Sequence, residues 1–101
     1  MIGIIDYNMG NLASVYNACK LIDADATIVK NPEDLKKFNR VILPGVGAYK
    51  DAMEHLVQTG MNEAVYEFAK TGKPMIGICL GMQLLFESSQ EFGHSDGLGL
   101  I

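Results

Sequence analysis

The sequence predicts an α/β fold in which a doubly wound, mostly parallel sheet lies between two layers of helices. Two observations lead to this fold class. Four short apolar runs have the length and composition of strands: Ile2–Ile5, Ala26–Val29, Val41–Leu43 and Met75–Ile78. Segments with apolar residues at helical spacing separate these runs, and such alternation gives a parallel sheet with right-handed crossovers.

Length and composition predict a single domain, residues 1–101. The formal net charge is −4 and charges of both signs are spread along the chain, which argues against nucleic-acid binding. No apolar run approaches the ~18 residues of a membrane span, and no leader precedes the first strand. We therefore expect a cytoplasmic protein with no membrane association, two reduced thiols, no metal and no cofactor.

The first apolar run, Ile2–Ile5, is followed by Asp6 and is expected to be the central strand. A loop is expected from Tyr7. Asn11 is a suitable cap for the helix that follows. The apolar stripe of that helix contains Leu12, Val15, Cys19 and Ile22. Since Cys19 lies on this stripe, we expect it to be a packing residue.

The middle of the chain predicts three further helices. Asn31 and Pro32 begin a short helix through about Lys37. Pro44 ends the strand Val41–Leu43. The next helix starts at Tyr49 and ends at Thr59 and Gly60; its apolar stripe is Tyr49, Ala52, Met53, Leu56 and Val57. Another stripe, closed by Thr71 and Gly72, contains Met61, Ala64, Val65, Phe68 and Ala69.

Cys79 follows the run Met75–Ile78, which has the composition of a strand buried on both faces. Glycines at 77 and 81 flank it as Gly-x-Cys-x-Gly, the thiol counterpart of the nucleophile elbow between a strand and a helix. Side chains at these two flanking positions would crowd so tight a turn, so we expect glycine to be needed there. We expect this helix to run to about Ser89, with a loop over residues 92–97 and a new strand from Leu98.

A cysteine at the start of a helix is activated by the helix dipole, which favours the nucleophilic thiolate. The N–H of Leu80 has no intrahelical acceptor there, so it can donate to an oxyanion. The alternative is a buried cysteine in an ordinary strand-to-helix turn.

The segment Pro44-Gly45-Val46-Gly47 offers only its backbone for chemistry, because its side chains are not reactive. It is not a phosphate-binding loop, and a plain turn is the alternative. This loop, the loop from Tyr7 to Asn11 and the Cys79 corner each follow a strand, so they should meet at the carboxyl edge of the sheet.

Residues 77–89, with Asp6 to Leu12 and Leu43 to Gly47, resemble class I, triad-type glutamine amidotransferases. Met82 to Phe86 is most similar to the glutaminase subunits of imidazole glycerol phosphate synthase, in histidine biosynthesis. The resemblance covers the whole chain and identifies it as the amino-terminal half of such a domain.

The resemblance implies that Cys79 attacks the side-chain amide of L-glutamine and that ammonia passes to a cyclase or synthase subunit in a heterodimer. It implies an oxyanion hole formed by Leu80 with Val46 or Gly47. It implies that Gln83 and Gly45 bind the substrate, and that Asn8, Gly10 and Asn11 form a partner-binding loop. Asn8 departs from the family, since many relatives have glycine there.

A cysteine nucleophile needs an imidazole base, and neither histidine suits. His55 lies off the apolar stripe and is expected to be solvated. His94 would lie about 15 Å from Cys79 if the intervening helix is straight. In the resembled family the triad His and Glu lie further downstream, so this chain is expected to be inactive alone.

Three alternatives remain at this point: a glutamine amidotransferase-like subunit of another pathway, a cysteine-elbow hydrolase or related stress protein, and a non-catalytic flavodoxin-like module or fragment. We also expect a flavodoxin-like strand order, with the second, first, third and fourth strands side by side. Unpaired strand edges and exposed apolar surface predict self-association of the chain.

Overall fold

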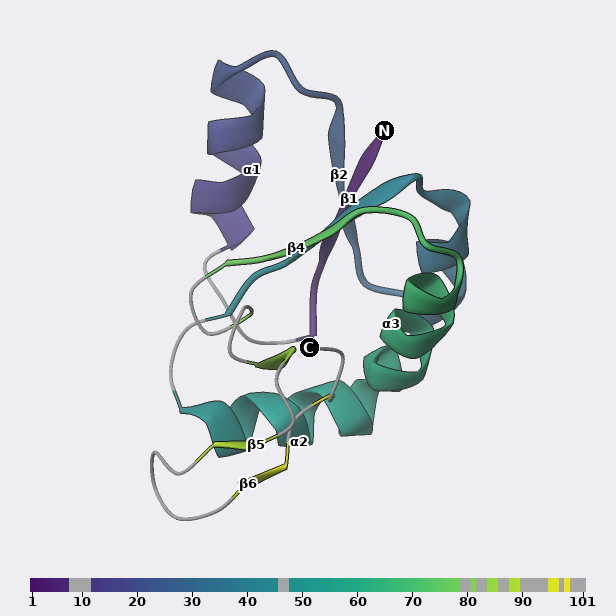
Figure 1. The fold of residues 1–101 in the computed structure, drawn as a ribbon. Coiled ribbons are helices and arrows are strands. Elements are labelled where there is room, and N and C mark those ends of the chain that lie inside the picture. The colour runs from purple at the N-terminus through teal and green to yellow at the C-terminus, as the bar shows by residue number, and fades with distance from the viewer. Residues whose placement is uncertain are drawn as a thin grey trace.

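The computed structural model describes residues 1–7, 12–45, 48–78, 81, 84–85, 88–89, 95–96 and 98. Its centre is a four-stranded parallel sheet with the order β2-β1-β3-β4 (Figure 1). The strands are β1 (Ile2–Ile5), β2 (Ala26–Val29), β3 (Arg40–Leu43) and β4 (Met75–Gly77). The expected strand order and parallel direction are confirmed.

Strand β1 is the centre of the sheet. Ile2 lies opposite Ala26 of β2 on one side and opposite Arg40 of β3 on the other. At the far end of β3, Leu43 lies opposite Gly77 of β4. The carboxyl ends of β1, β3 and β4 therefore lie along one edge of the sheet, where ligands of such folds gather.

Helices cover both faces of the sheet, as the doubly wound arrangement requires. They are α1 (Leu12–Leu21), the 3-10 helix η1 (Pro32–Lys37), α2 (Tyr49–Thr59) and α3 (Met61–Lys70). Helix α1 packs on one face, where Cys19 meets Ile4 and Ile42. The other three helical segments contribute to a cluster on the opposite face, around Ile5 and Leu43. In Figure 1, α1 and α3 lie on opposite sides of the sheet.

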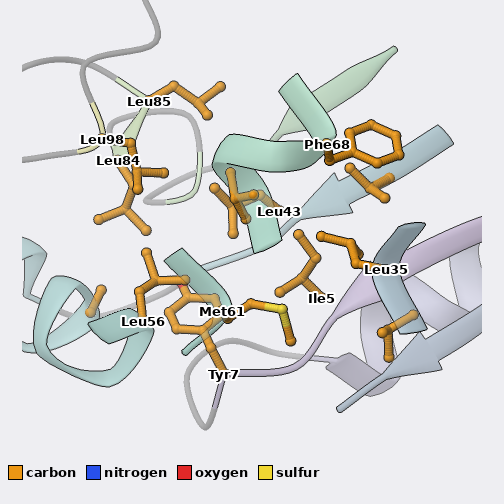
Figure 2. Close-up of a cluster of buried hydrophobic side chains, with 14 of the residues drawn as sticks. Ile5, Tyr7, Leu35, Leu43, Leu56, Met61, Phe68, Leu84, Leu85 and Leu98 are labelled. Carbon is orange, nitrogen blue, oxygen red and sulfur yellow. The ribbon is translucent and has the colours of Figure 1, made fainter. Parts of the chain in front are cut away.

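The larger core lies between the sheet and α2, α3 and η1 (Figure 2). Its members are aliphatic and aromatic side chains that range along the sequence from Ile5 to Leu98, with none from α1. Those labelled in the figure are Ile5, Tyr7, Leu35, Leu43, Leu56, Met61, Phe68, Leu84, Leu85 and Leu98. Tyr7 thus belongs to the same buried cluster as Leu98, more than 90 positions later in the chain.

Local sequence signals explain where helices begin and end. The Asn31 side chain accepts a hydrogen bond from the Glu33 N–H at 3.0 Å, and Pro32 occupies the first helical position of η1. Gly60 separates α2 from α3 with φ +76, a left-handed conformation that glycine adopts without strain.

Three apolar residues are more exposed than the sequence predicted. Ile22 follows the last residue of α1 and is 77% exposed, and Val57 on α2 is 57% exposed. Ile76, in the strand expected to be buried on both faces, is 59% exposed. Within the described chain β4 pairs only with β3, and α1 lies over β1 and β2, leaving Ile76 uncovered.

The prediction of a helix to about Ser89 is wrong. Gly81 and Leu84 are helical and Leu85 lies in a turn. Beyond them β5 (Ser88–Ser89) pairs antiparallel with β6 (Ser95–Asp96), within the segment expected to be a loop. Serine side chains compete for backbone hydrogen bonds and so disfavour helix interiors.

Leu98, where a further strand was expected to begin, lies in no strand. Its N–H donates to the Leu84 carbonyl at 2.9 Å, and its side chain is buried in the larger core. Residues 99–101 lie outside the described part of the chain.

Candidate active site

The ends of β1 and β3 are joined by one buried side-chain hydrogen bond. The Tyr7 hydroxyl donates to the Pro44 carbonyl oxygen at 2.7 Å, across 37 positions of sequence. Both residues are fully buried. Desolvation raises the pKa of the Tyr7 hydroxyl above its ordinary value, so the group remains a proton donor at neutral pH. The first residues of two of the three predicted loops, Tyr7 and Pro44, are therefore in contact.

The end of β4 joins the same place from the other side. The Ile78 N–H donates to the Leu43 carbonyl at 3.0 Å, continuing the ladder beyond β4. The Gly81 N–H then donates back to the Ile78 carbonyl at 2.9 Å. This bond joins two residues three positions apart, and Gly81 is in helical conformation.

Gly81 lies against the backbone at the end of β3. A Cβ at this position would overlap the Leu43 carbonyl oxygen and lie 3.1 Å from the Pro44 carbonyl carbon. The sequence predicted that this glycine is needed because the turn itself is tight. The structure shows a further reason, because the neighbouring strand end occupies the space of a side chain.

Of the predicted site residues, only Gly45 is described. It is buried and directly follows Pro44 at the carboxyl end of β3. Ala48, the N-cap of α2, has an extended backbone, and its carbonyl accepts the Ala52 N–H at 3.1 Å. The other predicted site residues lie outside the described part of the chain: Asn8, Gly10, Asn11, Val46, Gly47, Cys79, Leu80 and Gln83.

The described histidine, His55, differs from the prediction that it is solvated. It is half-buried in α2, and its Nδ1 is buried without a hydrogen-bond partner. Thr59 Oγ1 donates to the His55 backbone carbonyl at 2.8 Å, which satisfies the main chain but not the ring. His94 lies outside the described residues.

Sequence reasoning placed Tyr7 in a loop and gave it no role. A signal was available, since Tyr7 lies two residues after Ile5 and so continues the face of β1 that points into the larger core. A tyrosine at such a position buries its ring and needs a partner for its hydroxyl. The identity of that partner, Pro44, depends on the sheet order.

Other features of the described chain do not extend the site. A groove of about 430 Å³ lies between η1 and α3, lined in part by Glu33, Glu63 and Phe68, and includes none of the predicted site residues. The described residues contain no cluster of side chains suited to a metal ion. None of the helices in the described ranges is long and apolar enough to cross a membrane.

Curated relatives share the sequence along its whole length. Proteins named "Imidazole glycerol phosphate synthase subunit HisH" are 65% identical in Wolinella succinogenes, 61% in Sulfurimonas denitrificans and 54% in Bacillus licheniformis. Each comparison covers 100% of this chain but 49%, 49% and 48% of the respective relative. The chain thus spans about half the length of these relatives.

Solved structures show the same fold. One described as "Crystal structure of glutamine amidotransferase" matches with a TM-score of 0.82 and 21% identity, over 99% of this chain and 52% of that one. A putative peptidase E from Listeria monocytogenes matches with a TM-score of 0.73 and 15% identity, over 99% of this chain and 62% of that one. Because their sequence identities to this chain are low, these two structures support the fold and nothing beyond it.

The family itself is decided by sequence. The model described as "Glutamine amidotransferase class-I" matches residues 3–93, which contain all three strand-end segments of the candidate site. Together with relatives above 50% identity across the whole chain, this match assigns the family. The chain belongs to the class-I glutamine amidotransferases.

Proposed function

We propose that this chain carries the nucleophile of a glutaminase, the subunit of imidazole glycerol phosphate synthase that supplies ammonia in histidine biosynthesis. Relatives at 46–65% identity carry that subunit's name. The structural observation that supports the proposal most directly is the meeting of three strand ends around Leu43 and Pro44. An oxyanion site of the proposed kind needs those ends to be adjacent.

The proposed reaction uses Cys79 as the nucleophile. Its thiolate forms a bond to the side-chain amide carbon of L-glutamine, and the carbonyl electron pair moves onto oxygen. As that oxyanion collapses, the C–N bond breaks and the nitrogen leaves as ammonia after gaining a proton. Water then cleaves the thioester to give glutamate and the free thiol.

The described residues on either side of Cys79, Ile78 and Gly81, support this role. The hydrogen bond from Gly81 to Ile78 spans the two residues that would provide the thiol and one oxyanion donor, the Leu80 N–H. Gly81 also contacts Leu43, the last residue of β3, three or four residues before the other proposed donor, Val46 or Gly47. The proposed oxyanion donors are therefore close in sequence to described residues that contact one another.

We propose that glutamine and the synthase subunit bind at the carboxyl edge of the sheet. Gln83 lies one helical turn after Cys79 in sequence and would hold the substrate above the thiol, together with the Gly45 backbone. Asn8, Gly10 and Asn11 would form the partner-binding loop after β1. The ammonia would pass to the cyclase subunit of a heterodimer, in a cytoplasmic enzyme.

No described histidine is placed to act as the base. His55 lies on α2, and no described contact brings it to the strand ends. We propose that the base and its orienting carboxylate lie in the half of the longer relatives that this chain does not match. A positioned base contributes about 10²–10⁴-fold, so the 101-residue chain should release little or no ammonia from glutamine.

The deciding experiment is alkylation of Cys79 by iodoacetamide at pH 7, followed by mass spectrometry of peptides. A Cys19→Ala variant isolates Cys79, and the same chain unfolded in urea gives the reference rate for an unactivated thiol. We expect the folded chain to react about fivefold faster than the unfolded chain. Cys79→Ala, which retains the buried Cys19, is the matched control and should react slowly when folded.

Slower reaction of Cys79 in the folded chain than in urea would contradict the nucleophile assignment. Ammonia release from glutamine is measured in parallel with and without a synthase subunit. Release that Cys79→Ser abolishes would show that a base is present within these 101 residues, and would direct attention to His55 or His94.

A further inference from the structure

We infer that Tyr7 is a positioning residue for the oxyanion hole of the proposed glutaminase reaction. Its hydroxyl holds the carbonyl of Pro44 and thereby sets the backbone that leads to the donors at Val46 or Gly47. This inference rests on the proposed function, since it concerns the same oxyanion hole. Tyr7 touches no reacting atom in this scheme and acts through the Pro44–Gly45 peptide.

The need for an anchor follows from the sequence of the loop. Glycine at 45 and 47 allows the backbone many conformations, so local sterics do not fix the direction of its N–H groups. Oxyanion donors are effective when they are oriented before the reaction begins. A loop with two glycines therefore needs an external contact to hold its peptide planes.

Tyr7 supplies such a contact at the first peptide of the loop. A trans peptide is planar, so fixing the Pro44 oxygen also fixes the direction of the Gly45 N–H on the opposite side. The bond is 2.7 Å long and both residues are fully buried, so water does not compete for the carbonyl. Burial also raises the pKa of the Tyr7 hydroxyl, which keeps it a donor.

A second contact holds the same strand end from the other side. Gly81 lies against the Leu43 and Pro44 carbonyl groups, and the Ile78 N–H donates to the Leu43 oxygen at 3.0 Å. The end of β3 at Leu43 and Pro44 is thus held between Tyr7 on one side and Ile78 and Gly81 on the other. Loss of the Tyr7 hydroxyl would leave the thiol in place but release one side of the proposed donor loop.

This separation of thiol from donor loop allows a specific test. Iodoacetamide reacts with a thiolate by displacement of iodide and develops no charge on a carbonyl oxygen. The aldehyde 5-oxopentanoate resembles glutamine without its α-amino group and adds reversibly to a thiolate, giving a tetrahedral adduct whose oxygen requires the oxyanion donors. Its dissociation constant is measured from the protection of Cys79 against iodoacetamide.

Both probes are applied to the Cys19→Ala chain and to the same chain with Tyr7→Phe, which retains the aromatic ring. We expect Tyr7→Phe to weaken the aldehyde adduct about tenfold, because one buried bond to the donor loop is lost. The rate of iodoacetamide alkylation should stay within about twofold. Tyr66→Phe, a half-buried tyrosine on α3, is the matched control and should change neither value.

Circular dichroism and thermal unfolding establish that each variant is folded. If Tyr7→Phe is unfolded in buffer, all chains are compared in trimethylamine N-oxide, which stabilises folded states. An unchanged aldehyde constant, or an equal loss of both reactions, overturns the positioning role. The Cys19→Ala chain with Tyr7 intact tests the proposed function itself. If the aldehyde does not protect Cys79 in this chain, and iodoacetamide alkylates Cys79 no faster in the folded chain than in the unfolded chain, the proposed function is wrong.

Discussion

Gly81 lies so close to the end of β3 that the absence of a side chain is a structural requirement. A Cβ there would overlap backbone atoms, which cannot move away as a flexible side-chain tip can. Alanine normally stabilises a helix relative to glycine, but the overlap opposes that preference. The packing of the turn against Leu43 therefore restricts position 81 more than helix propensity does.

We expect Gly81→Ala to lower the free energy of unfolding by about 3 kcal/mol, as overpacking of a dense region does. Urea unfolding followed by circular dichroism measures it. Gly72→Ala is the matched control: its φ is +76, but no atom lies within 4 Å of a Cβ there. That change should cost only about 1 kcal/mol of backbone strain. Equal losses in the two variants would show that the contact with β3 does not matter.

Burial of Tyr7 predicts a loss of stability in alkaline solution. Its pKa is raised in the folded chain by desolvation, whereas an unfolded tyrosine titrates near pH 10. Below pH 10 the stabilisation is complete. Above it the unfolded chain releases a proton that the folded chain keeps, so stability falls as pH rises.

Tyr7→Phe removes this dependence. Between pH 10 and pH 11 the variant should lose about 1 kcal/mol less free energy of unfolding than the unmodified chain. Urea unfolding at pH 8, 10 and 11 provides the comparison, and Tyr66→Phe should follow the unmodified chain. The same alkaline slope in all three proteins would contradict the assignment to Tyr7.

At the residue scale, the sequence predicted a candidate site but not the contacts that join its strand ends. The Gly-x-Cys-x-Gly spacing indicated that position 81 must be glycine, and the structure confirms the crowding. The obstacle is Leu43, which lies 38 positions earlier, so only knowledge of the strand order identifies it. The Tyr7–Pro44 bond was missed for the same reason, because it joins residues that are adjacent only in the folded sheet.

At the scale of elements, helix η1 is short and depends on its ends. Its first N–H groups have no intrahelical acceptor, and the Asn31 side chain satisfies that of Glu33 at 3.0 Å. Two exposed ion pairs, Glu33 with Lys36 and Asp34 with Lys37, contribute little because solvent screens them. The cap is therefore the main polar contribution among these contacts.

Asn31→Ala should lower the free energy of unfolding by about 1 kcal/mol. Thermal and urea unfolding of the two chains measure the difference. Asn17→Ala, on the exposed surface of α1, removes an amide of the same kind from a helix interior and should be neutral or slightly stabilising. A destabilisation by Asn17→Ala as large as that by Asn31→Ala would argue against a capping role.

Periodicity predicted the main elements well and their ends less well. Apolar runs gave all four sheet strands, although β3 begins at Arg40, one residue early, and β4 ends at Gly77, one residue before the predicted end. The β5–β6 hairpin was missed because two-residue strands have too little sequence pattern to be recognised. Residues such as Val57 also show that apolar spacing marks a helix face without establishing what covers it.

At the scale of the whole molecule, the face of the sheet near β4 is open. Ile76 lies opposite Ile42 in the register and is 59% exposed, and within the described chain no strand pairs with the outer edge of β4. An open parallel edge with apolar side chains favours association with another chain. The earlier expectation of self-association thus stays a prediction, now located at one edge.

Ile76→Lys should reduce self-association, because a charge at an exposed edge opposes strand pairing and removes apolar surface. Light scattering and analytical ultracentrifugation over a range of concentrations measure the average mass. Val57→Lys is the matched control, since Val57 is exposed to a similar degree, 57%, but lies on α2. A stable monomer at high concentration before any substitution would refute the prediction.

Strand β1, which lies between β2 and β3 in the sheet, is synthesised before either of these neighbours. Ile2 pairs with Ala26 and then with Arg40, so β1 cannot complete its hydrogen bonding until about 40 further residues have been made. At a synthesis rate of about 5–20 residues per second this takes about 2–8 s. During that time Ile4 and Ile5, fully buried in the native fold, remain open to chaperones and to neighbouring nascent chains.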